Sequence, residues 1–124
     1  MKTTLVFLII ASFLLGCEAQ LESGIAQMHK ESRQTGEEVT PLLEQLVQTK
    51  ASINIQGRAL TQEEIAFTQN VDKLEATFAQ WDKDMEKAEG MKMDKERLGL
   101  EQALKDAINA FKKQVLTLAP PAPY

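Results

Sequence analysis

A single apolar repeat in the second half of the chain restricts the fold to packed helices. Apolar residues recur there at alternating spacings of four and three, at Phe67, Val71, Leu74, Phe78, Trp81, Met85 and Ala88. An α-helix has about 3.6 residues per turn, so this spacing places every member on one stripe, as in helices that pack lengthwise. Thr61 and Glu64 precede the stripe as a capping-box pair, and Gly90 follows it. We therefore predict a helix over about residues 62–89.

Two further stripes predict two more helices. The last third of the chain carries Leu100, Leu104, Ala107, Ile108, Phe111, Val115 and Leu118. A helix over about residues 94–118 follows, with Asp94 at its start and Lys112 near its end, charges that favour the helix dipole. Upstream lie Val39, Leu42, Leu43, Leu46, Val47 and Ile53, after weaker apolar positions at Leu21, Ile25 and Met28. Pro41 either starts a helix here or kinks a longer one; we expect the longer helix, over about residues 18–56, bent near Gly36.

The stripes and the connections between them define the expected fold. No run alternates apolar and polar residues, so a β-sheet is not expected. Short connections at residues 56–61 and 89–94 favour antiparallel neighbours. We predict an all-α fold, an antiparallel three-helix bundle over residues 36–118 whose first helix is long and kinked. Residues 119–124 carry three prolines and are expected to form an extended, disordered tail.

The start of the chain has the composition of an export signal. Residues 1–4 carry one positive charge, and the uncharged apolar run from Leu5 to Leu15 is too short to span a bilayer. The run ends in Leu14-Leu15-Gly16-Cys17, which contains the chain's only cysteine. This sequence resembles the lipobox of bacterial lipoproteins, with Leu15 in place of a smaller residue. The resemblance implies a signal peptide over residues 1–16, a diacylglycerol thioether and a further acyl chain such as palmitate on Cys17, and a lipidated segment over residues 17–35.

Other interpretations of this segment are an ordinary secretory signal that leaves a free thiol, and an uncleaved anchor. A lone exposed thiol would be a liability in an exported protein, and no second cysteine is present to pair with it. Several acyl chains on one residue are sufficient for stable membrane attachment. We therefore expect a lipid-anchored protein of the bacterial cell envelope, and Glu18 after the cysteine favours the outer membrane under the enterobacterial sorting rule.

A second resemblance covers the helical part. It rests on the run Glu38-Val39-Thr40-Pro41-Leu42-Leu43-Glu44-Gln45-Leu46, on Lys50, and on Phe78-Ala79-Gln80-Trp81 between Leu74 and Met85. These residues are similar to those of small helical lipoproteins of the Bacteroidota, some of which are labelled "viral A-type inclusion protein". The resemblance covers about residues 36–115 and implies a helical lipoprotein, but it brings no function and no functional residues.

Charge and motifs exclude several function classes. Eighteen acidic and 14 basic residues give a net charge of −4, which argues against a nucleic-acid partner. The chain has no Gly-rich phosphate loop, zinc-ligand spacing or nucleophile elbow, so we predict no enzyme and no cofactor. His29, the only histidine, is expected to be an ordinary surface residue. The acidic residues over 82–89 alternate with Lys83 and Lys87, which is typical of a solvated helix face.

Two apolar features have alternative interpretations. Met91 and Met93, near Met85, could bind Cu(I) through thioether sulfurs, but methionines at a helix junction more often fill gaps in a core. We favour the core and keep copper as the weaker candidate. Trp81 could be an exposed binding anchor, but its place in the stripe favours burial.

Three function classes remain. The first is a non-enzymatic scaffold or interaction lipoprotein with an unknown protein partner, attached to the membrane through Cys17. The second is a binding module that takes copper, or an apolar ligand in a cavity lined by Phe78, Leu104 and Phe111. The third is a membrane-acting lysis peptide, which a long, acidic, bundle-forming chain disfavours. The first class is our prediction.

Overall fold

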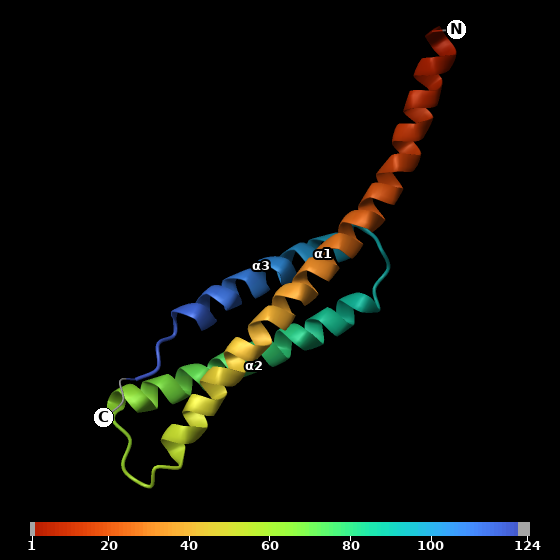
Figure 1. The fold of residues 1–124 in the computed structure, drawn as a ribbon. Coiled ribbons are helices and arrows are strands. Elements are labelled where there is room, and N and C mark those ends of the chain that lie inside the picture. The colour runs from red at the N-terminus through yellow and green to blue at the C-terminus, as the bar shows by residue number, and fades with distance from the viewer. Residues whose placement is uncertain (1, 122–124) are drawn as a thin grey trace.

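The computed structural model describes the backbone of residues 2–121 and the side chains of residues 19–121. Over this part of the chain the secondary structure is three helices and no strand: α1 (Lys2–Asn54), α2 (Gln62–Glu89) and α3 (Lys95–Thr117). The helices pack against one another as a bundle (Figure 1). The predicted all-α three-helix bundle is therefore confirmed, and the bounds of α2 agree with the prediction.

The first helix is longer than predicted. It begins at Lys2 rather than near residue 18, because the apolar run before Gly16 contains no proline that would stop it. Figure 1 shows this N-terminal part of α1 extending alone beyond the ends of α2 and α3. Along the described side chains of α1, Ile25 is the first that is fully buried. Among the described residues, no helix has a stretch both long enough and apolar enough to cross a membrane.

Pro41 lies inside α1 without ending it. Proline has no backbone N–H, so the carbonyl oxygen of Glu37, one turn earlier, lacks its usual helical donor. Glu37 and Pro41 are both exposed, and water can replace that donor on this face. The prediction of one long helix through Pro41 is confirmed.

Apolar side chains of all three helices form one core. Trp81 lies in it with 6% of its surface exposed, as its place in the stripe predicts. The indole Nε1 donates a hydrogen bond of 3.0 Å to the carbonyl oxygen of Leu104 on α3. The ring of Phe78 packs against the rings of both Trp81 and Phe111, with a centroid distance of 5.6 Å in each case. These three rings tie α2 to α3 through aromatic contacts.

A close approach between α1 and α2 depends on Gly36. A Cβ atom built on Gly36 would lie 2.7 and 2.8 Å from two ring carbons of Trp81. No real Cβ tolerates such distances, so only glycine lets the indole lie against the backbone of α1. Gly36 therefore sets how closely the two helices approach at this level.

The start of α2 is held by a complete capping box and an ion pair. The Thr61 side chain accepts from the Glu64 backbone N–H, and the Glu64 carboxylate accepts from the Thr61 N–H. Arg58 donates two hydrogen bonds of 2.8 Å to the same carboxylate. The Arg58 guanidinium, followed by the Thr61 N–H, lowers the pKa of Glu64 from 4.5 to about 2. The predicted cap is confirmed, and Gly57, with a φ of 67°, makes the turn before it.

Candidate interaction groove and charged cluster

An apolar groove of about 460 Å³ lies between α1 and α2. Its apolar lining is Leu43, Val47, Phe78 and Ala79, and its polar lining is Thr40, Glu44, Gln48 and Glu75. Phe78 and Val47 are only partly buried although they pack against the core. The groove therefore exposes part of the core surface, an arrangement typical of helical binding sites. We call these eight residues the α1/α2 groove.

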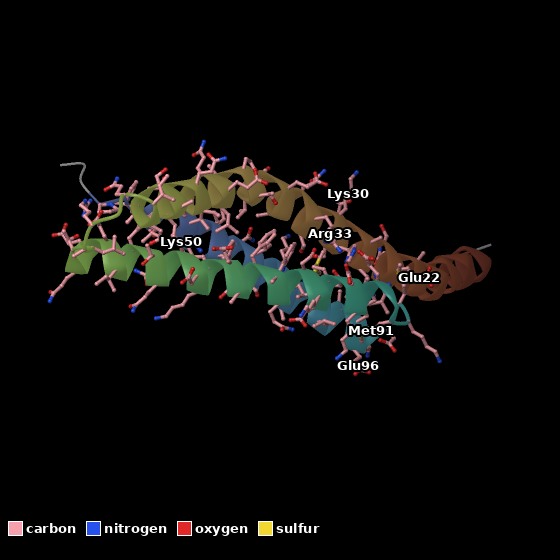
Figure 2. All side chains as sticks on the ribbon, turned by 90° about the horizontal axis from the view of Figure 1, so that it is seen from below. Glu22, Lys30, Arg33, Lys50, Met91 and Glu96 are labelled. Atoms are coloured by element: carbon pink, nitrogen blue, oxygen red, sulfur yellow. The ribbon has the colours of Figure 1, made fainter. Side chains whose placement is uncertain are left out.

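Two cations of α1 hold α2 at the two ends of this groove. Lys50 Nζ lies 2.7 Å from Asp72 and 2.8 Å from Glu75, and these two hydrogen bonds raise the pKa of Lys50. Toward the other end, Arg33 Nη1 lies 2.7 Å from Asp82. Figure 2 shows Lys50 and Arg33 in the space between the two helices. The α1/α2 groove thus lies between two cross-helix ion pairs.

The carboxylates around the groove are not all neutralised. Among the described residues, Glu44 in the groove has no hydrogen-bond or ion-pair partner, and neither has Glu37, two turns before it on α1. On α2, Glu86 is also exposed and unpaired, and it lies two turns after Ala79 on the same face. The groove therefore combines an apolar floor with an acidic border.

A charged cluster joins all three helices beyond Arg33. His29 on α1 places Nδ1 at 2.9 and 3.1 Å from the two carboxylate oxygens of Glu101 on α3. Its Nε2 lies 3.0 Å from Oε1 of Glu89 on α2. Arg33 donates to the same Glu89 oxygen at 2.9 Å. The hydrogen bonds from Arg33 and then from His29 lower the pKa of Glu89.

The most buried ions of the cluster lie on α3. The side chain of Glu101 is 0% exposed, and that of Arg97, one turn earlier, is 7% exposed. Arg97 Nε lies 3.5 Å from Glu101, and its Nη1 donates to the carbonyl oxygen of Met91 at 3.2 Å. Because an unpaired buried charge is strongly destabilising, the contact from His29 matters for Glu101. We call His29, Arg33, Asp82, Glu89, Arg97 and Glu101 the charged cluster.

One sequence-based site prediction in this cluster needs correction. The prediction of a surface His29 is wrong: its side chain is 16% exposed and contacts two carboxylates. The acidic residues over 82–89 lie on a solvated face as predicted, and two of them, Asp82 and Glu89, also pair with Arg33 of α1. Sequence reasoning missed these contacts, although His29 lies one turn after Ile25 on the apolar stripe, which was a signal for burial.

The methionines near the α2–α3 corner do not both lie in the core. Met91 is partly buried and Met93 is 41% exposed at the α2–α3 corner, so Met93 is not the core residue that we favoured. Phe78 and Phe111, which we predicted as part of the lining of an internal ligand cavity, pack against each other with their ring centroids 5.6 Å apart. The described residues contain no group of three or more His, Cys, Asp or Glu side chains placed to hold a metal ion. The predicted lipidation site, the Cys17 side chain, lies outside the described residues.

No family model, no curated protein and no solved structure matches this chain.

Proposed function

We propose that this protein is a lipid-anchored, non-enzymatic interaction module of the bacterial cell envelope, and that its α1/α2 groove binds a basic amphipathic helix of a protein partner. The observation that carries this proposal is the apolar floor of the groove next to unpaired carboxylates. Membrane attachment through acylated Cys17 is the second part of the proposal and rests on the lipobox-like sequence. The two parts are tested separately.

The chemistry of the groove selects the partner. The floor offers Leu43, Val47 and Phe78 to apolar side chains, and the stretch of α1 from Thr40 to Gln48 is about 12 Å long at 1.5 Å per residue. This length suits about two turns of helix, with apolar residues at positions i, i+3, i+4 and i+7. Glu44 on the border favours lysine or arginine beside those residues, because opposite charges across an interface raise both specificity and association rate.

A contact of this size is weak by itself. Small interfaces are typical of transient complexes. A lipid anchor would compensate, because confinement at one membrane raises the effective concentration of two attached partners. The proposed anchor and the proposed groove therefore support each other.

The groove is tested with a synthetic helix of leucine and lysine as the probe. Glu44→Lys should weaken its binding at least about tenfold by placing a like charge on the border. Glu22→Lys makes the same charge change at an exposed position of α1 outside the groove and should leave binding unchanged. Equal losses in both variants would mean general charge attraction and would overturn the groove. Stronger binding of an uncharged apolar dye than of the peptide, unaffected by Glu44→Lys, would favour the alternative of a small apolar ligand.

The anchor is tested with Cys17→Ala and an alkyne-labelled fatty acid. We expect the wild type to take up the label and to fractionate with membranes, and the variant to lose both while its bundle still folds. Label-free wild-type protein in the membrane fraction would contradict acylation at Cys17. Fractionation of inner and outer membranes then tests the expected location.

A further inference from the structure

We propose that His29 is a proton-dependent clamp: its imidazolium form joins α1 to α2 and α3, and loss of its proton loosens the end of the bundle from which α1 extends. The proposal rests on the placement of the ring between carboxylates of two other helices. It requires neither the lipid anchor nor a partner in the groove.

The ring geometry needs two donors. Nδ1 faces Glu101 at 2.9 Å and Nε2 faces Glu89 at 3.0 Å. An ionised carboxylate only accepts hydrogen bonds, so each ring nitrogen must carry a hydrogen to make its contact. A neutral imidazole has one N–H and one lone pair. Deprotonation of His29 therefore turns one of the two contacts into a lone pair facing a carboxylate.

The surrounding charges balance only when the ring is protonated. From α1 the cluster receives Arg33, from α2 it receives Asp82 and Glu89, and from α3 it receives Arg97 and Glu101. Lys30 and Glu22 of α1 are exposed nearby (Figure 2). With imidazolium, the charged cluster holds three cations and three anions. With neutral imidazole it keeps one excess negative charge.

Loss of the His29 proton should be most destabilising at Glu101, because this carboxylate is the most buried group of the cluster. Its carboxylate is 0% exposed, and Arg97 Nε, at 3.5 Å, is too distant to make a strong hydrogen bond. His29 supplies the two shorter contacts, at 2.9 and 3.1 Å. A fully buried carboxylate with a weakened partner is destabilising, so the clamp acts where desolvation is greatest.

The location of His29 determines what loosens. Ile25 is the first fully buried side chain of α1, and His29 follows it by one turn. Arg97, in the same cluster, holds the carbonyl oxygen of Met91 at the corner between α2 and α3. Loss of the proton should therefore weaken residues 25–35 of α1 together with the corner over residues 89–97, while the opposite end of the bundle stays closed.

The sign of the pH effect follows from this preference. The protonated ring donates to both Glu101 and Glu89, whereas the neutral ring donates to only one of them, so the clamp is closed in mildly acidic solution and opens when a rise in pH removes the ring proton. Glu89 does not reverse this at the acid end, because the hydrogen bonds from Arg33 and His29 lower its pKa and keep it ionised.

Hydrogen exchange of the full chain at about pH 6 and about pH 8 tests the clamp, with rates corrected for intrinsic exchange. We expect protection of residues 25–35 and 89–97 to fall at least about tenfold at the higher pH, as for loss of a hydrogen bond to a charged group. Protection of α1 over residues 39–53 should be unchanged and serves as the internal control.

Two variants keep the test decisive. His29→Gln should remove the pH dependence of residues 25–35. If that variant does not fold, Glu89→Gln replaces it, because Glu89 is half exposed and its amide can donate to a neutral ring nitrogen. Glu89→Gln should reduce the pH dependence while leaving the bundle folded. Equal protection of residues 25–35 in the wild type at both pH values, or the same pH dependence in the variants, would overturn the clamp.

Discussion

Gly36 shows how a single missing atom determines the packing of two helices. Because a Cβ there would lie 2.7 Å from the Trp81 ring, Gly36→Ala must displace the indole, its stacking on Phe78, or the backbone of α1. We expect a loss of about 1 to 3 kcal/mol in the free energy of unfolding, as is typical of an overfilled core. Urea denaturation measures it.

Gly99→Ala is the matched control for this prediction. A Cβ on Gly99 meets nothing within 4 Å, and the residue lies inside α3. Alanine there should raise the free energy of unfolding by about 0.5 to 1 kcal/mol through helix propensity. Equal effects of the two substitutions would show that Trp81 does not press on Gly36.

Ser32 on α1 is buried, and its hydroxyl oxygen has no hydrogen-bond partner among the described residues. Its Oγ is the one buried side-chain oxygen or nitrogen without a hydrogen bond among the described residues. By contrast, the hydroxyls of Thr35 and Thr40 each donate to the carbonyl oxygen one turn earlier. Since an unsatisfied buried hydroxyl is destabilising by about 1 to 3 kcal/mol, Ser32→Ala should leave stability unchanged or raise it. A lower thermal midpoint in the variant would mean that Oγ has a partner in solution.

At the residue scale the sequence predicts some environments and not others. The burial of Trp81 is predictable because its stripe lies within one helix. The contacts of His29 are not, because Glu89 and Glu101 are 60 and 72 residues away in the sequence. A helical stripe indicates that a residue faces a partner helix, but it carries no information on which residue of that helix lies opposite.

At the scale of the element, helix ends encoded locally are predictable. Both signals for α2 lie within a few residues of its ends, and its bounds agree with the prediction. The start of α1 is not marked by a cap, and its apolar first part continues the helix back to Lys2. The predicted start of α1, near residue 18, was therefore wrong because no capping residue marks the start of this helix.

The cap of α2 also carries a pH dependence. The pKa of Glu64 is lowered from 4.5 to about 2, so its contribution is fully present above about pH 4.5 and is lost as the pH falls toward 2. Glu64→Gln keeps an acceptor for Thr61 but removes the charge that binds Arg58. We expect the variant to be less stable at neutral pH and to lose less stability on acidification, measured as the thermal midpoint at a series of pH values.

Glu63→Gln is the control for the acid titration. Glu63 is the preceding residue in the first turn of α2, and it is exposed. Its substitution should leave the acid dependence close to that of the wild type. Parallel curves for the wild type and Glu64→Gln would contradict a charge-dependent cap.

At the scale of the whole molecule, the bundle is predictable but its groove is not. The stripes indicate which side chains face inward, not how far apart two helices lie. That distance depends on opposing side-chain sizes: α2 lies close to α1 at Gly36, while Leu43 and Val47 line a groove of about 460 Å³ further along. Phe78 therefore belongs both to the predicted core and to an accessible surface.

Because α1 is unbroken from residue 17 to Asn54, the direction in which the groove of the proposed lipid-anchored module faces is fixed relative to its anchor. If Cys17 is acylated as proposed, the helix from Cys17 to Ile25 has no break, and each residue inserted between them turns the groove by about 100° around the helix axis. Two alanines after the exposed Gln20 would turn the groove by about 200°, away from a partner fixed in the same bilayer. Seven alanines would bring it back to within about 20° while lifting it by about 10 Å. We expect crosslinking from Gln48 to its partner to fall with two inserted residues and to recover with seven, whereas a steady decline with insert length would show that the segment acts as a tether.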